Sequence, residues 1–218
     1  MYRFIFILLS IIVLSACHSD EQQGDFSFTG IKIARYDRLQ YEATVQNSFF
    51  SLQRMNTEFA QETRLLIEDV LDLGAVNTPD INERLCAYFS DSILVHLMED
   101  VEEKFKDMSP FEKRLTRGFK NLKREMPDLQ IPKVYTQISA LSEIVLGISL
   151  DKYMGTEYPL YKRYYYANQR RSMSPDDIVP DCFTFYLLGQ YPFPWMEGHR
   201  SLMDILLYRG KIAWGVET

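Results

Sequence analysis

The sequence has few of the residues that carry metal or nucleophilic chemistry. It contains three histidines and three cysteines in 218 residues, whereas a closed zinc site needs three or four converging ligands. It has no Gly-x-Ser-x-Gly nucleophile elbow and no glycine-rich phosphate loop, and neither Cys86 nor Cys182 has a flanking histidine. These absences argue against a metal centre, a serine hydrolase, a nucleotide-binding protein and a cysteine-dependent enzyme.

Positive charge is also scarce. The chain has 24 Lys and Arg against 30 Asp and Glu, which gives a formal net charge of -6, and its basic residues do not cluster. Proteins that bind nucleic acid neutralise phosphates with Lys and Arg gathered on one face. We therefore expect no nucleic-acid partner.

The N-terminus is predicted to be a lipoprotein signal peptide over residues 1–16. Arg3 precedes an apolar run, and Leu14-Ser15-Ala16-Cys17 places small residues directly before a cysteine. The run is shorter than the ~20 apolar residues that cross a bilayer. We expect cleavage before Cys17, whose lipid would then anchor the protein through about 0.8 kcal/mol per buried methylene. A plain anchor helix is the alternative.

Residues 17–30 are predicted to be the lipidated cysteine and a flexible acidic tether. The stretch His18 to Asp25 is polar and has nothing to bury. Ser19-Asp20-Glu21 resembles the short acidic signals that direct some Bacteroidota lipoproteins to the cell exterior, and a simple spacer is the alternative. The expected location is therefore the cell envelope, at either face of the outer membrane.

Residues 31–218 are predicted to form one α+β domain, mainly helical with a small β-sheet. The 46% of apolar residues suffices for one core. In the first half, the patterns predict a strand at 31–37 and a long helical stretch from there to Leu73 that stops at Gly74. Three helices are predicted next: one opened by Thr78-Pro79-Asp80, one carrying Ile93 to Phe105, and one with a Ser109/Glu112 capping box that ends at Pro127. In the second half, the patterns predict two strands at 134–138 and 144–148 joined around 140–142, a helix from Pro175 to Gln190 capped by Ser174, and a helix from Leu202 to Tyr208.

Two cysteines remain after Cys17. Cys86 and Cys182 lie in apolar helical patterns, and an envelope protein is in a compartment that permits a disulfide. A disulfide and two buried free thiols are both open.

Five segments of the chain resemble the gliding-motility lipoprotein B family (GldB) of Bacteroidota. The resemblance covers nearly all of the mature chain, and its most specific part is Leu-Asp-Lys-Tyr-Met-Gly at 150–155. The segments are Ile33 to Asp37, Pro132 to Thr136, Leu146 to Gly155, Tyr158 to Tyr161, and Asp177 to Asp181.

The resemblance implies a zincin-like shell, that is, the shape of a zinc-peptidase domain. Active domains of that shape carry His-Glu-x-x-His on a helix after a strand pair, and a later helix supplies a third ligand, commonly Glu. Here the helix predicted over 175–190 has no histidine, and Arg209, which repels a divalent cation, stands near the later position. The resemblance therefore implies the shell without metal, cofactor or catalysis.

The resemblance also implies where a partner would bind. In zinc-peptidase shells the strand ends and the start of the next helix form a cleft wall, which here holds five candidate residues: Asp151, Tyr153, Tyr158, Tyr161 and Arg163. Tyrosines combine apolar area with a polar tip, as binding surfaces do. The alternative is structural, with Asp151 capping amides and the tyrosines packed.

Two functions stay open. The favoured one is a non-catalytic, membrane-anchored protein that binds envelope proteins, in gliding species those of the gliding or associated secretion machinery. The rival is a metal-dependent hydrolase of peptides or envelope polymers, with essential residues in a missing C-terminal part, because family members continue for about a hundred residues past Gly210-Lys211. A truncated chain is accordingly expected, and a naturally shorter member is the alternative.

A glycosidase would need two carboxylates at a separation that sequence does not set.

Overall fold

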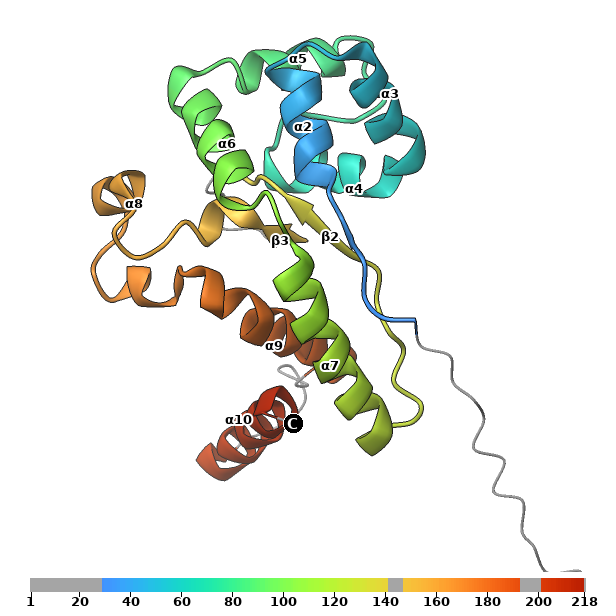
Figure 1. Ribbon diagram of the computed structural model, residues 1–218, viewed down its shortest axis with the longest axis vertical. Coiled ribbons are helices and arrows are strands. Elements are labelled where there is room, and N and C mark those ends of the chain that lie inside the picture. The colour runs from blue at the N-terminus through green and yellow to red at the C-terminus, as the bar shows by residue number, and fades with distance from the viewer. Residues whose placement is uncertain (1–28, 141–146, 193–200, 218) are drawn as a thin grey trace, which may run out of the picture.

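The computed structural model describes residues 29–140, 147–192 and 201–217. Within these ranges the chain is mainly helical and contains a small parallel sheet, which confirms the α+β prediction. The sheet lies in the middle of the molecule, with helices α2 to α5 at one end and α7, α9 and α10 at the other (Figure 1). The predicted signal peptide, Cys17 and most of the tether lie outside the described residues, so the domain boundaries stay a prediction.

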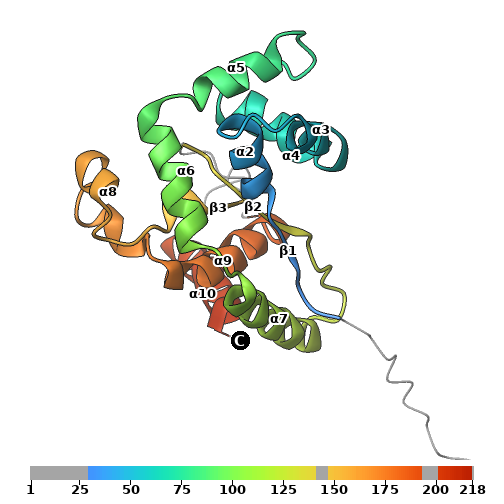
Figure 2. The same ribbon diagram turned by 45° about the horizontal axis from the view of Figure 1, so that its top comes forward.

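The sheet has three short strands in the order β1-β2-β3. They are β1 (Ile33–Ala34), β2 (Val134–Gln137) and β3 (Ile148–Ser149), and both pairs are parallel. Figure 2 shows β1 beside β2, with α9 on the opposite side of the sheet from α2. The predicted strand pair is present, but its parallel direction rules out a hairpin, and residues 144–146 lie outside the described ranges.

The predicted long helical stretch up to Leu73 is helical over most of its length, but it is not continuous. The structure has instead α2 (Tyr36–Thr44), α3 (Phe49–Glu58), α4 (Ala60–Leu65) and a π-helical turn over Leu66–Val70. Asn47 has a φ of 52°, and the Ser48 side chain accepts a hydrogen bond from the Ser51 amide at 3.2 Å. A left-handed residue followed by a cap ends one helix and starts the next.

Helix α5 (Ile81–Tyr88) begins later than predicted. Pro79 is not its first residue, because Thr78 is held in the preceding turn: its hydroxyl donates to the Ala75 carbonyl at 2.6 Å. Helix α6 (Ser92–Lys104) follows, and the Asp91 carboxylate caps it by accepting a hydrogen bond from the Ile93 amide at 2.8 Å.

Helix α7 (Ser109–Glu125) ends before Pro127 as predicted, but its start differs from the predicted capping box. The Ser109 amide donates to the Asp107 carboxylate at 2.8 Å. The Glu112 carboxylate does not turn back to Ser109. It accepts hydrogen bonds from the Ile33 amide at 3.0 Å and the Lys32 ammonium at 3.1 Å, and thereby joins α7 to β1.

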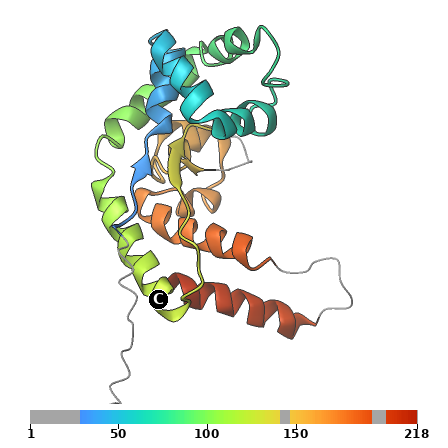
Figure 3. The same ribbon diagram turned by 90° about the vertical axis from the view of Figure 1, so that its right-hand side faces the viewer.

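The last third of the described chain is helical. It contains 3-10 turns over Leu150–Lys152, Gln169–Ser172 and Pro175–Asp177, and helices α8 (Pro159–Tyr164), α9 (Ile178–Gln190) and α10 (Leu202–Glu217). The predicted cap by Ser174 is confirmed as a capping box with Asp177. Helix α10 continues well past Tyr208, and Figure 3 shows it lying alongside α9.

One hydrophobic core connects these layers. Tyr36, Phe89, Phe105 and Phe119 are among its fully buried side chains. Cys86 and Cys182 are both free and half-buried, so the disulfide alternative is excluded. None of the helices in the described ranges has the length and apolar character needed to cross a membrane.

A candidate binding cleft between the sheet and helix α9

A cleft of about 480 Å³ lies where α9 faces the sheet, and we refer to it as the α9 cleft. Its walls come from α7, from β2 and the residues before it, from the start of β3 and the turn after it, and from α9. Most of the side chains are aliphatic or aromatic. The lining residues are Leu115, Phe119, Pro132, Lys133, Val134, Tyr135, Gly147, Ile148, Lys152, Tyr153, Asp181, Cys182, Phe185 and Tyr186.

Close packing of α7 against α9 positions the helical wall of the cleft. Gly118 lets Phe183 approach so closely that a Cβ atom at position 118 would lie 2.3 Å from the Phe183 ring. The next residue, Phe119, contacts Phe183 and Tyr186 with ring centroids 4.8 and 5.3 Å apart. This packing turns Phe185 outward, where 65% of its surface is exposed at the cleft.

The polar group of the cleft is a pair formed by Tyr153 and Asp181. The Tyr153 hydroxyl donates to the Asp181 carboxylate, with 2.9 Å between the oxygens. Burial raises the pKa of Asp181, against the lowering effect of this hydrogen bond, and the nearby Asp177 carboxylate raises the pKa further. Burial and the charge of Asp181 also raise the pKa of Tyr153.

Cys182 lies next to this pair and is not activated. Burial, with a smaller effect of the Asp181 charge, raises the pKa of its thiol to about 12. A thiol attacks as its thiolate, so Cys182 is a poor nucleophile at neutral pH. Of the described residues that line the cleft, only Asp181 carries a carboxylate, whereas carboxylate catalysis of the glycosidase type uses two. The cleft is therefore equipped to bind an apolar group and to exchange hydrogen bonds with a polar group beside it.

Two lysines add positive charge to the cleft. Lys133 is exposed just before β2. Lys152, in the turn after β3, donates to the Tyr165 hydroxyl at 3.3 Å and lies over the Tyr165 ring, 5.8 Å from its centroid. A partner segment that carries a carboxylate beside an apolar side chain would match this arrangement.

Only some of the five residues predicted to form a binding surface lie together: the rings of Tyr158 and Tyr161 are in contact, with centroids 5.2 Å apart, and Tyr161 bonds to the Asp151 backbone. Tyr153 lines the α9 cleft. The Tyr158 hydroxyl donates to Asp100 of α6 at 2.7 Å, and Arg163 is exposed with its guanidinium 5.4 Å from the centre of the Tyr164 ring. Their role in binding stays a prediction.

Asp151 and Tyr161 are fully buried. The Asp151 carboxylate accepts hydrogen bonds from the Ser139 amide and hydroxyl, both at 2.9 Å, and so joins the ends of β2 and β3. The Tyr161 hydroxyl donates to the Asp151 carbonyl and accepts from the Met154 amide at 3.0 Å. Gly155, with a φ of 103°, ends this segment in a conformation that suits glycine.

The sequence did not single out the pairing of Asp181 with Tyr153. A lone carboxylate within the apolar run of α9, between Val179 and Phe183, is the signal that marks it. A charged residue on a largely buried helix needs a polar partner. Its partner is 28 residues away in the chain, which no local pattern reports.

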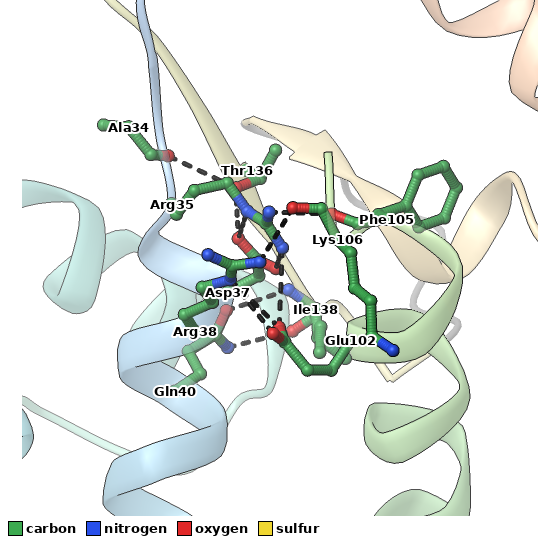
Figure 4. A network of polar contacts seen from close by, with 10 residues as sticks. All are labelled: Ala34, Arg35, Asp37, Arg38, Gln40, Glu102, Phe105, Lys106, Thr136 and Ile138. Atoms are coloured by element: carbon green, nitrogen blue, oxygen red, sulfur yellow. Dashed lines mark hydrogen bonds and ion pairs between the residues drawn. The ribbon is translucent and has the colours of Figure 1, made fainter. Parts of the chain in front are cut away.

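A second polar cluster, which we call the Arg35 network, joins the helices to the sheet (Figure 4). The Arg35 guanidinium donates two hydrogen bonds to the Asp37 carboxylate, at 2.9 and 2.7 Å, and one to the Phe105 carbonyl at 2.7 Å. The Asp37 carboxylate is also hydrogen-bonded to the Thr136 hydroxyl, and Glu102 lies 3.5 Å from Arg35.

Gln40 extends the Arg35 network along α2. Its side-chain amide donates to the Ile138 carbonyl at 3.1 Å and accepts from the Ile138 amide at 2.8 Å, as a neighbouring strand would. Removing one partner of a buried ion pair leaves an uncompensated charge. The network thus fixes α2, β2 and the corner between α6 and α7, and gives the segments 33–37 and 132–136 a structural role.

No group of three or more His, Cys, Asp or Glu in the described part of the chain is placed to hold a metal ion. His96 is exposed on α6 and lies 3.2 Å from Glu99. His18 and His199 lie outside the described residues. The donor set that is described therefore does not form a zinc-peptidase centre.

These features define a mainly helical α+β domain with a largely apolar cleft, a candidate binding site, that contains one tyrosine–carboxylate pair. A family model described as gliding motility protein GldB matches residues 19–218. The chain belongs to this family, a family of gliding-motility lipoproteins, as the sequence resemblance predicted. Neither a curated protein nor a solved structure matched the chain.

Proposed function

We propose that the protein is a non-catalytic lipoprotein, anchored by Cys17 to the outer membrane, that acts by binding other envelope proteins. In a gliding species these partners belong to the gliding machinery or its associated secretion machinery. Membership of the GldB family supports a role in gliding motility. The domain is, on this proposal, a zinc-peptidase-like shell that has kept a cleft and lost the metal ligands.

The chemistry of the α9 cleft is the observation that carries the binding role. Its walls are apolar, its Tyr153–Asp181 pair is half-buried, and its Cys182 thiol stays protonated at neutral pH. Such a site stabilises a complex by burying an apolar side chain, at about 25 cal/mol per Å² of apolar surface, and by forming a few hydrogen bonds with the polar groups next to that side chain. We infer that it takes an apolar anchor residue of a partner protein.

Site-specific cross-linking tests this proposal. A photoreactive phenylalanine analogue replaces Phe185, at the cleft, in the full lipidated chain within its native envelope. The matched control replaces Tyr166, which is 80% exposed and does not line the cleft. We expect light-dependent adducts with an envelope protein from position 185 and none from position 166.

A cleft variant adds a second readout. Tyr153→Phe keeps the ring but removes the hydroxyl that contacts Asp181, so the yield of the adduct from position 185 is expected to fall while the chain remains folded by circular dichroism. Equal adducts from both positions, or none from position 185, would contradict a binding role for the cleft.

A further inference from the structure

Helix α10 presents an apolar face to solvent. Leu202, Met203, Leu206, Leu207 and Trp214 on this helix each have between 54% and 72% of their surface exposed. Met203, Leu207 and Trp214 follow one another at helical spacings of four and seven, and Leu202 and Leu206 form the adjoining row. The exposed residues therefore make a continuous stripe, which we call the α10 face.

The opposite side of α10 is apolar as well. Ile212 and Gly215 are buried, and a Cβ atom at Gly215 would lie 2.7 Å from Leu187 of α9. A helix that is apolar on both sides is normally covered on both sides. Large contiguous apolar patches mark places where a protein meets another protein or a membrane.

A groove of about 590 Å³ runs beside the stripe, between α10 and the end of α9. Tyr191, Tyr208 and Trp214 line it with Lys211. The Tyr208 hydroxyl donates to the Tyr191 carbonyl at 2.8 Å, so it stays at the rim. Tyrosine and tryptophan are the residues enriched where an apolar layer meets water, as at the surface of a bilayer.

The charges next to the α10 face suit lipid head groups. Arg209 and Lys211 are exposed and flank the stripe on its two sides. Long basic side chains at such edges reach the anionic head groups while the apolar stripe is buried. Asp204, the acid in the first turn, is already held by hydrogen bonds from the Ser201 amide and hydroxyl at 2.9 and 2.8 Å.

The described chain starts beside α7, the helix that the end of α10 also contacts. The Ile31 amide donates to Thr116 of α7 at 2.9 Å, and a Cβ atom at Gly215 of α10 would lie 3.9 Å from Leu122 of the same helix. Figures 1 and 3 show the start of the described chain and α10 in the half of the molecule away from α3. The residues from Cys17 to Thr29 span roughly 40 Å at most when fully extended.

We propose that the α10 face docks onto the lipid surface of the membrane that holds the Cys17 lipid. This inference rests on the proposed lipidation. One side of helix α10 packs along α9, so the helix lies in the plane of the interface. The tether keeps the face at a high local concentration next to the lipid, which makes weak docking effective. The domain is then held in one orientation, with the α2 to α5 end pointing away from the membrane.

Fluorescence of Trp214 in the lipidated full chain tests the docking. Trp195→Phe leaves Trp214 as the single tryptophan, because the chain contains two. The protein is reconstituted through its lipid into phosphatidylethanolamine and phosphatidylglycerol vesicles, with or without bromine on the acyl chains. We expect brominated vesicles to quench Trp214 emission and ordinary vesicles to shift it to shorter wavelength and protect it from iodide.

Two matched double variants localise the effect. Leu206→Asp with Leu207→Asp places charge on the α10 face and is expected to abolish quenching by brominated lipid. Phe49→Asp with Phe50→Asp changes an equally apolar pair on α3, where the side chains are 78% and 68% exposed, and is expected to leave the quenching unchanged.

The outcomes separate this inference from the lipidation on which it rests. Mass spectrometry first establishes that the reconstituted chain carries lipid, and a chain without lipid contradicts the proposed anchor. A lipidated chain whose Trp214 is not quenched overturns the docking alone. Protection of Trp214 from iodide without vesicles, rising with protein concentration, would instead assign the α10 face to contact between two copies of the chain.

Discussion

The Tyr153 hydroxyl and the Asp181 carboxylate are 2.9 Å apart and join the turn after β3 to helix α9 across the candidate cleft. This pair connects the two walls that would have to keep their spacing for a ligand to fit. The pair also makes the cleft sensitive to pH, because partial burial raises the pKa of the Asp181 carboxyl group.

The stability of the fold is expected to depend on pH through Asp181. Burial raises its pKa above the ordinary value of 3.8, so the folded state holds this proton more tightly than the unfolded state. The resulting stability is present below the unfolded pKa and is lost as pH rises through the folded pKa. Asp181→Asn cannot ionise, so its stability relative to the wild type should be greater at pH 7 than at pH 3.5 in urea unfolding.

Asp176 provides the control for that measurement. Its side chain is 98% exposed, so Asp176→Asn measured at both pH values controls for the change from aspartate to asparagine. An Asp181→Asn difference that does not change with pH would show that Asp181 titrates alike in the folded and unfolded states.

Two glycine-to-alanine substitutions should have opposite effects. Gly118→Ala pushes a methyl group to 2.3 Å from the Phe183 ring, so α7 and α9 must separate, at a cost of about 1–3 kcal/mol. Gly189→Ala on α9 meets nothing within 4 Å and should stabilise the helix by up to about 1 kcal/mol. Thermal unfolding of both variants checks this. Equal changes in the Tm of both variants would contradict the close approach of Phe183 to Gly118.

The buried Tyr161 hydroxyl should matter more than the half-buried Tyr158 hydroxyl. Tyr161→Phe leaves the Asp151 carbonyl and the Met154 amide without this partner and should destabilise the protein by about 1–3 kcal/mol. Tyr158→Phe removes one bond to Asp100 near solvent and should cost less than about 1 kcal/mol. A larger effect of Tyr158→Phe in denaturant unfolding would reverse this assignment.

Cys17→Ala is expected to abolish lipidation. The small residues before Cys17 predict the cleavage site, and the lipid is carried by the cysteine itself. Cells that express the variant should incorporate no labelled palmitate into the protein, whereas Cys86→Ala should label like the wild type. Continued labelling of the Cys17 variant would eliminate the lipoprotein prediction.

Purified protein from residue 18 onward is expected to bind zinc no better than background. The described residues offer no cluster of three or more ligands, and structural and catalytic zinc sites need three or four. Elemental analysis after dialysis should find far less than one zinc per chain, and a chelator should leave the Tm unchanged. One zinc per chain would revive the metallopeptidase alternative.

Local patterns predicted much of the helical part of the fold. The stripe Leu115, Phe119 and Leu122 on α7 is buried, as its four- and three-residue spacing predicted. The cap at Ser174 could also be predicted, because Ser174 and its partner Asp177 lie within one turn of each other. These features depend on residues a few positions apart.

The features that the sequence did not predict depend on contacts between residues far apart in the chain. Glu112 bonds to the Ile33 amide 79 positions away instead of capping its own helix, and the parallel direction of β2 and β3 depends on the whole sheet. At the site, Tyr161 belongs to the same aromatic run as Tyr158, but only the fold shows that one is buried and the other reaches α6.

The parallel pairing of β1 with β2 has a consequence for the order in which the domain folds. The Thr136 hydroxyl lies 3.2 Å from the Ala34 carbonyl, 102 positions earlier in the chain. A chain made from its N-terminus delivers β1 about a hundred residues before the strand it pairs with, and such non-local contacts form slowly. During that interval the apolar surfaces of α2 to α5 have no sheet to cover them. The first half of the domain therefore cannot complete its core until β2 has been made and has paired with β1.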